Sequence, residues 1–167
     1  AVFLSTRAKD EAPDYQPSEL GYNYRLSNVC AGIGRGQMEV LDQRIAQRRA
    51  NHQFYQDIFK DIEGVTVFSE PNEDYFSNFW LTNIIIDPSV STCNREILRL
   101  KLLENDIESR PLWKPLHLQP IFKSSTYFGA KVSETLFNNG LCLPSGSNLS
   151  DEDKTRISNC IKSCFEK

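Results

Sequence analysis

The feature that most constrains the fold is a helical pattern that begins at Ser27 and continues to Ile62. Ser27 or Asn28 can cap the first turn through a side-chain oxygen, and Gly64 follows the last turn, where a left-handed residue is favoured. The pattern predicts one helix of about 35 residues, roughly 50 Å long. A helix of that length is too long to be hidden in a globule of 167 residues, so we expect it to pack along a partner domain or a second subunit. Its apolar residues recur three and four positions apart, and they are Val29, Ile33, Val40, Leu41, Ile45, Phe54, Tyr55, Ile58, Phe59 and Ile62.

Three glycines interrupt this pattern in the stretch GIGRG, residues 32–36. A phosphate-binding loop is one interpretation, but the spacing is not GxGxxG and no strand precedes it. Close packing against another backbone is the better interpretation. Each glycine costs a helix up to about 1 kcal/mol relative to alanine, so tight packing should compensate.

The rest of the chain alternates short strand-like and helix-like stretches. Branched and aromatic residues predict strands, and apolar spacing with caps predicts helices, the last of them beginning after Ser150. This order predicts a small α+β layer, in which a mostly antiparallel sheet of few strands carries helices on one face. The predicted strands are 65–70, 79–87, a proline-broken strand at 108–120 and 141–144; the predicted helices are 94–105, 132–139 and the C-terminal helix.

Composition excludes several classes of protein. The net charge of −3 leaves no basic footprint for nucleic acid, and no window approaches the roughly 18 apolar residues of a membrane span. Arg44, Arg48 and Arg49 lie at helical spacing, and we interpret them as a solvated or subunit-facing helix face. The five cysteines have irregular spacing, without CxxC or a pair of histidines, which favours buried thiols, no metal site and a reducing, cytoplasmic compartment.

Few residues offer catalytic chemistry. His52 stands among polar helix residues and is predicted to lie on the surface. His117 lies in PLWKPLHLQP, where prolines can hold Trp113, Lys114 and His117 as one wall of a ligand site. The competing interpretation is an edge strand whose prolines block aggregation. The order of residues indicates no serine or cysteine triad.

The stretch GYNYR, residues 21–25, places Asn23 and Arg25 immediately before the long helix. It follows a polar segment, residues 7–20, that contains two prolines and is predicted to be a loop. A loop of this length is commonly functional or disordered, and the ordered pattern that follows it favours function.

Four stretches, in this order, resemble the C-terminal part of the DegT/DnrJ/EryC1/StrS aminotransferases. They are FLSTRAKD (3–10), GYNYRLSNVCAGIGRGQMEVLDQRIAQRR (21–49), RPLWKPLHLQPIF (110–122) and GLCLPSGSNLSDED (140–153). Members of this family are pyridoxal 5'-phosphate enzymes that aminate keto sugars on nucleotide carriers, with glutamate as the amino donor. The residues are most similar to the bacillosamine-pathway transaminases, which act on C4 of a UDP-linked 4-keto-6-deoxy-N-acetylhexosamine.

The resemblance implies a fold and a set of site residues. The fold is the α+β C-terminal domain of an α/β fold-type I pyridoxal phosphate-dependent transferase that works as a homodimer. Asn23 matches the asparagine that reaches across the dimer to the cofactor phosphate, and Arg25 matches a position near loop backbone or the neighbouring subunit. The substrate pocket is lined by the stretch that holds Arg110, Trp113, Lys114 and His117.

The resemblance also implies that part of the enzyme lies outside this chain. The family's Schiff-base lysine precedes the stretch FLSTRAKD, so the chain alone is expected to be inactive. We expect residues 1–26 to continue from a cofactor-binding N-terminal domain, and residues 27–167 to form the small domain with its long leading helix. Two alternatives remain at this point, a sugar 3-dehydratase of the same family, which has histidine in place of that lysine, and a non-catalytic dimerisation module.

Overall fold

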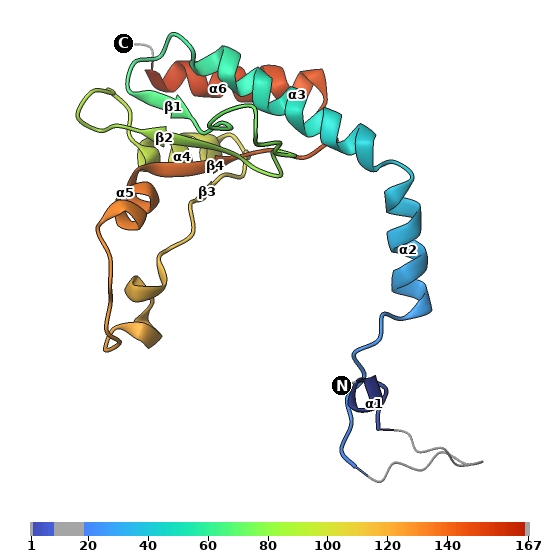
Figure 1. The fold of residues 1–167 in the computed structure, drawn as a ribbon. Helices are drawn as coiled ribbons and strands as arrows, with labels where there is room; N and C mark the ends of the chain where they lie inside the picture. Colours follow the sequence, from blue (N-terminus) through green and yellow to red (C-terminus); the bar gives the residue numbers. More distant parts are fainter. Residues whose placement is uncertain (1, 9–18, 166–167) are drawn as a thin grey trace. The chain divides into compact units, whose positions relative to one another are not determined.

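The computed structural model describes residues 2–8 and 19–165. The chain divides into two compact units, Ala1–Leu41 and Asp42–Lys167, called here the N-terminal and C-terminal units (Figure 1). Most of the predicted loop at 7–20 lies outside the described residues. Within the described part of the chain, no helix has both the length and the apolar character needed to cross a membrane.

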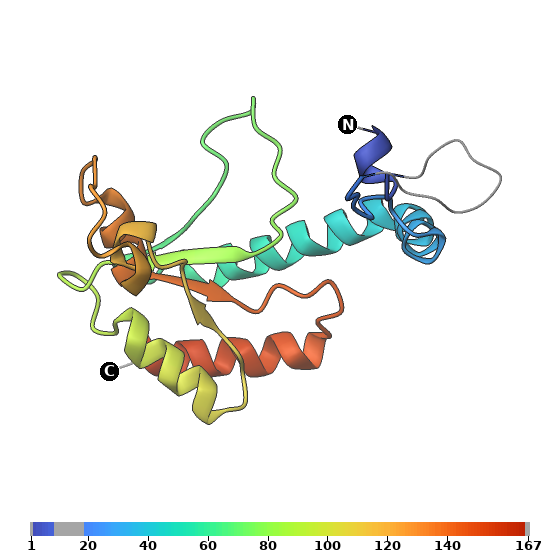
Figure 2. The ribbon, with the colours of Figure 1, turned by 90° about the horizontal axis from the view of Figure 1, so that it is seen from below.

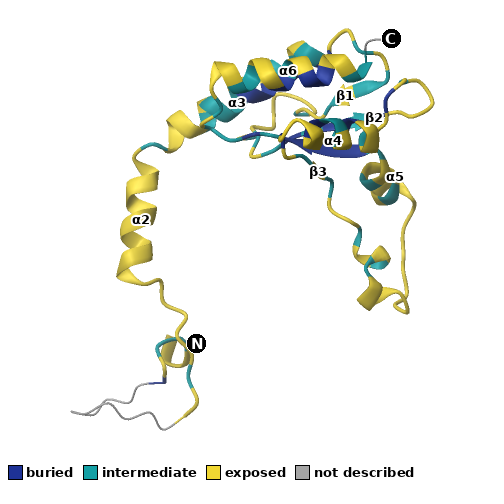
Figure 3. Cartoon of the chain, turned by 180° about the vertical axis from the view of Figure 1, so that it is seen from behind, coloured by how far each residue is buried: buried dark blue, intermediate teal, exposed yellow. Residues whose placement is uncertain are grey.

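The N-terminal unit contains two helices, α1 (Val2–Ser5) and α2 (Asn28–Met38). The Ser27 side chain caps α2 by accepting a hydrogen bond from the Cys30 backbone N–H at 3.2 Å, as the sequence predicted. No residue of α2 is buried within the chain (Figure 3). The expected close packing at GIGRG is absent within the described residues, because a Cβ added at Gly32, Gly34 or Gly36 would meet nothing within 4 Å.

The single long helix predicted from Ser27 to Ile62 is present as two helices. After α2 ends at Met38, α3 runs over Leu41–Phe59. At the break, the backbone N–H of Val40 donates to the carbonyl of Gln37, three residues back rather than four. Glycines at every second position and the branched Val40 make this stretch a weak helix former, which explains why the helical ladder is interrupted without a proline.

The C-terminal unit is built on a four-stranded antiparallel sheet with strand order β1-β2-β4-β3. The inner pair aligns Ile84 with Leu141. Proline restricts the predicted strand at 108–120 to two residues, after which the chain forms two short 3₁₀ turns, Leu116–Leu118 and Pro120–Phe122. The strands are β1 (Val65–Val67), β2 (Thr82–Ile86), β3 (Arg110–Pro111) and β4 (Gly140–Leu143).

Three helices cover one face of this sheet and enclose the core. They are α3, α4 (Arg95–Glu104) and α6 (Asp151–Phe165), and α4 and α6 lie side by side (Figure 2). Burial alternates along β2, where Thr82, Ile84 and Ile86 are buried, so every second side chain faces these helices. The helix α5 (Val132–Asn139) differs from the expected arrangement, because it lies on the other side of the sheet from α3 and α6 (Figure 1). The buried core residues are Tyr55, Phe59, Ile84, Ile86, Cys93, Leu98, Leu102, Ile107, Leu141, Leu143, Ile157, Cys160 and Ile161.

The start of α6 confirms the predicted cap. The Asp153 backbone N–H donates to the Ser150 hydroxyl at 3.1 Å, and the Asp153 carboxylate accepts from the Ser150 backbone N–H at 3.0 Å. This reciprocal pair is a capping box with aspartate in place of glutamate. It sets the first residue of the helix that completes the core.

The buried hydroxyl of Tyr55 donates to the carbonyl of Pro144 at 2.7 Å. We predict that Tyr55→Phe lowers the free energy of unfolding by about 1–2 kcal/mol, because a buried carbonyl loses its donor. Tyr127→Phe is the matched control, since Tyr127 donates to Ala130 at the same 2.7 Å on an exposed surface, where water can replace the hydroxyl. Urea denaturation measures both variants, and equal losses would contradict the explanation.

Candidate functional site

Two stretches that are distant in sequence pair in the N-terminal unit. Thr6 and Asn23 form an antiparallel bridge. The Tyr22 N–H donates to the Leu4 carbonyl at 2.7 Å, and the Arg7 N–H donates to the Tyr22 carbonyl at 2.9 Å. We call residues 2–8 and 21–24 the clasp. It holds the backbone of GYNYR in a defined place just before α2.

Gly21 is required because the two backbone segments of the clasp approach each other closely at this residue. A Cβ at this position would lie 2.3 Å from the Ala8 nitrogen and 2.3 Å from the Arg7 carbonyl carbon. Arg7 and Ala8 have φ values of 66° and 49°, so the opposing chain turns sharply through left-handed conformations. Any side chain at residue 21 would push these backbones apart.

An open hollow of about 610 Å³ lies beside the clasp, and we call it the clasp hollow. The guanidinium groups of Arg7 and Arg25 and the N-terminus of α2 make it electropositive. Asn23 is exposed and lines the hollow, so its carboxamide N–H groups can meet a ligand there. This donor set fits a phosphate group. The lining residues are Thr6, Arg7, Asn23, Arg25, Leu26, Ser27 and Asn28.

A second cavity, of about 660 Å³, contains three of the four predicted substrate residues. Arg110, Trp113 and Lys114 line it, and the Trp113 ring lies 6.2 Å from the ring of Trp80 at an interplanar angle of 36°. We call this cavity the tryptophan pocket. Phe137 is also among the apolar residues that line it. Aromatic faces with nearby cations suit a ligand that has both planar rings and negative charge.

His117 does not line the tryptophan pocket. Its ring stacks on Tyr127 with centroids 3.8 Å apart, and its Nε2 lies 3.1 Å from a carboxylate oxygen of Glu134. Its role in substrate binding therefore stays a prediction without support from this cavity. Trp80 was missed because it reads as part of a strand. The only signal was its place two residues before β2.

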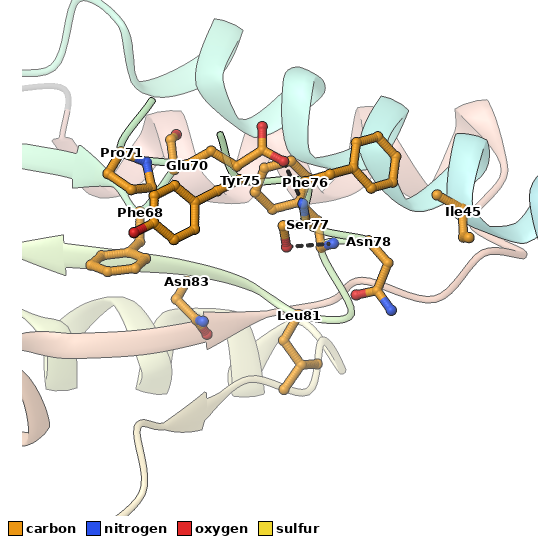
Figure 4. A pocket seen from close by; sticks show the side chains of 12 residues that line it. Ile45, Phe68, Glu70, Pro71, Tyr75, Phe76, Ser77, Asn78, Leu81 and Asn83 are labelled. Carbon is orange, nitrogen blue, oxygen red and sulfur yellow. Dashed lines mark hydrogen bonds between the residues drawn. The ribbon is translucent and has the colours of Figure 1, made fainter. Parts of the chain in front are cut away.

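A third cavity, of about 650 Å³, is lined mainly by the loop that joins β1 to β2 (Figure 4). Glu70 organises this loop by accepting hydrogen bonds from the Arg49 guanidinium and from the Ser77 backbone N–H. These bonds lower the pKa of Glu70 to about 2, with Arg49 the larger cause. Arg49 also lies over the ring of Phe76, 4.5 Å from its centroid.

The structure corrects two predictions about α3. His52 was placed on the surface, yet it is buried, with its ring stacked on Phe79 at 3.7 Å and its Nε2 3.2 Å from the Ser69 hydroxyl. Arg48 and Arg49 were read as a solvated or subunit-facing face. Arg48 instead donates to the carbonyls of Trp80 and Ser145, the latter at 3.0 Å. Helical spacing could not reveal that the β1–β2 loop folds back over these residues.

The cysteine prediction holds in part. All five cysteines are free thiols, and Cys93, Cys142 and Cys160 are buried. Cys164 is half-buried, and Cys30 is exposed on α2, so the expectation of buried thiols is wrong for Cys30.

Comparison with known proteins decides the family. The model of the DegT/DnrJ/EryC1/StrS aminotransferase family matches residues 3–162. The chain belongs to this family. The match includes nearly all of the clasp, the tryptophan pocket and most of α6, and it confirms the resemblance seen in the sequence.

Individual relatives agree with this assignment. EpsN of Bacillus subtilis (strain 168), named as a pyridoxal phosphate-dependent aminotransferase, is 41% identical over 161 residues, which cover 94% of this chain and 40% of EpsN. GDP-perosamine synthase of Vibrio cholerae is 36% identical over 149 residues, which cover 87% of this chain and 39% of that enzyme. The chain thus spans about 40% of the length of these curated relatives.

Solved structures show the same fold. A DegT DnrJ EryC1 StrS aminotransferase from Brucella abortus has a TM-score of 0.78 and 27% sequence identity, over 99% of this chain and 43% of that one. This likeness confirms the predicted α+β part of an aminotransferase fold. Neither a non-catalytic module nor a sugar dehydratase is favoured by these comparisons.

We predict that Gly21→Ala opens the clasp, because the added methyl group meets backbone atoms that have no room to move. Hydrogen exchange of the Tyr22 and Tyr24 amides, which donate to Leu4 and Ser5, should become at least about tenfold faster, as expected for a loss of 1.4 kcal/mol or more. Gly32→Ala is the control, since its Cβ meets nothing within 4 Å and alanine favours the helix. Unchanged protection in Gly21→Ala would contradict the steric argument.

We predict that His52 makes stability depend on pH. Burial lowers the pKa of His52, and the charge of Arg49 lowers it further. The unfolded chain therefore binds a proton near the ordinary pKa of about 6.5 before the folded chain does, so stability is lost as pH falls below that value. Urea denaturation between about pH 7.5 and pH 5 should show this slope, and His52→Gln should flatten it. Glu70 titrates in a lower range and should not affect this window. A variant with the wild-type slope would refute the assignment.

Proposed function

We propose that this chain is the C-terminal portion of a pyridoxal phosphate-dependent aminotransferase. The full-length protein transfers an amino group from glutamate to C4 of a nucleotide-linked 4-keto-6-deoxy sugar of the UDP-N-acetylhexosamine type. It works as a homodimer in the cytoplasm. The observation that carries the proposal is the family match over residues 3–162, which includes every stretch assigned to a site.

The clasp hollow supplies the cofactor contact in this proposal. Asn23 donates its amide N–H groups to the cofactor phosphate in the partner subunit, and the N-terminus of α2 adds a favourable dipole. Arg25 contributes positive charge nearby. The clasp matters because the phosphate contact depends on backbone position, which Thr6 and Gly21 determine.

The tryptophan pocket binds the nucleotide sugar in this proposal. Trp80 and Trp113 offer aromatic faces, and Lys114 and Arg110 offer positive charge to a diphosphate. Arg110 is paired with Glu108 on the surface, at 2.8 Å and with both side chains largely exposed. Because an exposed pair of this kind is weak, the guanidinium can exchange its carboxylate for a substrate phosphate.

The chemistry itself requires residues outside this chain. Pyridoxal phosphate, when bound, carries the amino group and stabilises the carbanion that forms at the reacting carbon. The described residues bind the phosphate and orient the sugar. In the family the proton is moved by a lysine that precedes the stretch FLSTRAKD, and the proposal places that lysine in another part of the full-length protein.

Amine transfer tests the proposed reaction. The full-length protein is incubated with glutamate and a panel of UDP-, dTDP- and GDP-linked 4-keto sugars, and the products are followed by mass. We expect the UDP-linked N-acetylated sugar to be aminated fastest. Amination of a GDP-linked sugar alone would contradict the proposed UDP-linked substrate. No amination of any 4-keto sugar would refute the proposed reaction.

We predict that Asn23→Ala in the full-length protein weakens retention of the cofactor about 10- to 100-fold, because a hydrogen bond to a charged group contributes roughly 1.5–3 kcal/mol. Asn23→Asp should weaken it further through repulsion of the phosphate. Cofactor absorbance after exhaustive dialysis measures retention. Asn105→Ala is the control, since the Asn105 carboxamide donates to a carbonyl of its own helix. Wild-type occupancy in both Asn23 variants would count against the assignment.

A further inference from the structure

Two thiols from distant parts of the chain meet at the edge of the core. The sulfur atoms of Cys93 and Cys164 lie 2.7 Å apart, although 71 residues separate them in sequence. We propose that Cys93 and Cys164 form an oxidisable dithiol, a site of reversible disulfide formation that fastens the end of α6 to the start of α4. This site is independent of the proposed transferase function.

The geometry around Cys93 holds its sulfur in place. Its backbone N–H donates to the Ser91 hydroxyl at 3.3 Å, and its thiol approaches the carbonyl of Asn94 at 3.5 Å. Asn94 is the N-cap of α4 and accepts from two backbone N–H groups at 2.9 Å each. The backbone of Cys93 is therefore held in the turn that leads into α4.

Cys164 is placed by the packing of α6. It lies one residue before the end of that helix, and the next residue, Phe165, packs edge-on against Phe59 of α3 with ring centroids 6.1 Å apart. A disulfide bond joins sulfurs about 2.05 Å apart, so the two thiols need to approach by only about 0.7 Å. The last turn of a helix can provide a shift of this size because its backbone is less constrained than the middle.

The two thiols differ in access, which determines the order of events. Cys93 is buried and Cys164 is half-buried, so a small peroxide reaches Cys164 first. Burial and the neighbouring thiol raise the pKa of Cys93 well above its usual value, which makes Cys93 a poor first nucleophile. Contact with Cys164 lets it act as the resolving thiol, because the reaction within the pair needs no encounter.

The chemistry balances with hydrogen peroxide as the oxidant. The Cys164 thiolate attacks one peroxide oxygen, the O–O bond breaks, and hydroxide leaves and takes up the thiol proton as water. Cys164 is now a sulfenic acid. The Cys93 sulfur then attacks the Cys164 sulfur, the S–O bond breaks, and a second water leaves with the proton of Cys93. Two thiols are oxidised to one disulfide and one peroxide is reduced to two waters. A dithiol reductant reverses the bond by exchange.

The other described cysteines lack this arrangement. Cys160 lies one turn earlier on α6, and its thiol is directed to the carbonyl of Lys101 at 3.5 Å. Cys142 is buried in β4, and Cys30 is exposed on α2 in the other unit. Cys160 is thus a matched control, because it lies on the same helix as Cys164 but its thiol is directed to Lys101 rather than to Cys93.

Peptide mapping tests the dithiol. The full-length protein is treated with hydrogen peroxide, free thiols are alkylated, and non-reduced peptides are analysed by mass. We expect the peptides that contain Cys93 and Cys164 to be joined, lighter by two hydrogen atoms than the two thiol peptides together, and separated again by dithiothreitol. Cys160→Ser should leave the link intact, and Cys164→Ser should abolish it.

The order of steps has its own test. In Cys93→Ser the resolving thiol is lost, so peroxide should leave Cys164 as a sulfenic acid that dimedone traps. Circular dichroism of the untreated variants establishes that they are folded. Full alkylation of both cysteines in oxidised wild-type protein would overturn the proposal, and so would an equal yield of a Cys93–Cys160 link when Cys164 is replaced.

Discussion

The pairing of β2 with β4 is the interaction on which the C-terminal unit depends. It joins segments that are far apart in sequence, and the register sets Ile84 beside Leu141 so that both face α3, α4 and α6. A shift of one residue would turn the buried side chains of Thr82, Ile84 and Ile86 away from the helices. The same register brings Trp80, two residues before β2, to the cavity that Cys142 of β4 also lines. The register of β2 against β4 therefore determines both the packing of the core and the position of the tryptophan pocket.

The clasp fixes the position of Asn23 with only a few backbone contacts. One bridge and a few backbone hydrogen bonds hold Asn23 at the entrance of α2, and Gly21 permits the close approach. The polar groups that converge there are fixed by backbone geometry rather than by burial. Under the proposed function this arrangement suits a contact with a phosphate, because exposed donors remain accessible to an anion.

Local signals in the sequence were sufficient for some elements and insufficient for others. The helices α4 and α6 could be predicted because caps and apolar spacing agree, and α5 because Gly140 follows a short apolar pattern. The strand β4 could be predicted because four extended residues follow that glycine. The break before α3 has no proline or turn signal, so the continuous apolar pattern hid it. Asn23, Trp113 and Lys114 were singled out by their local sequence, and the roles predicted for them came from the resemblance to a family. His52, Trp80 and the Cys93–Cys164 pair could not be found, because each depends on a loop or helix that returns from a distant part of the chain.

Arg48 connects the helical layer to the wall of the tryptophan pocket. Its guanidinium joins the carbonyls of Trp80 and Ser145, two residues that line the tryptophan pocket, while α3 contributes no side chain to that lining. One guanidinium of α3 thus ties together two residues of the pocket wall. A substitution at Arg48 can consequently change the shape of this cavity although no residue of α3 lines it.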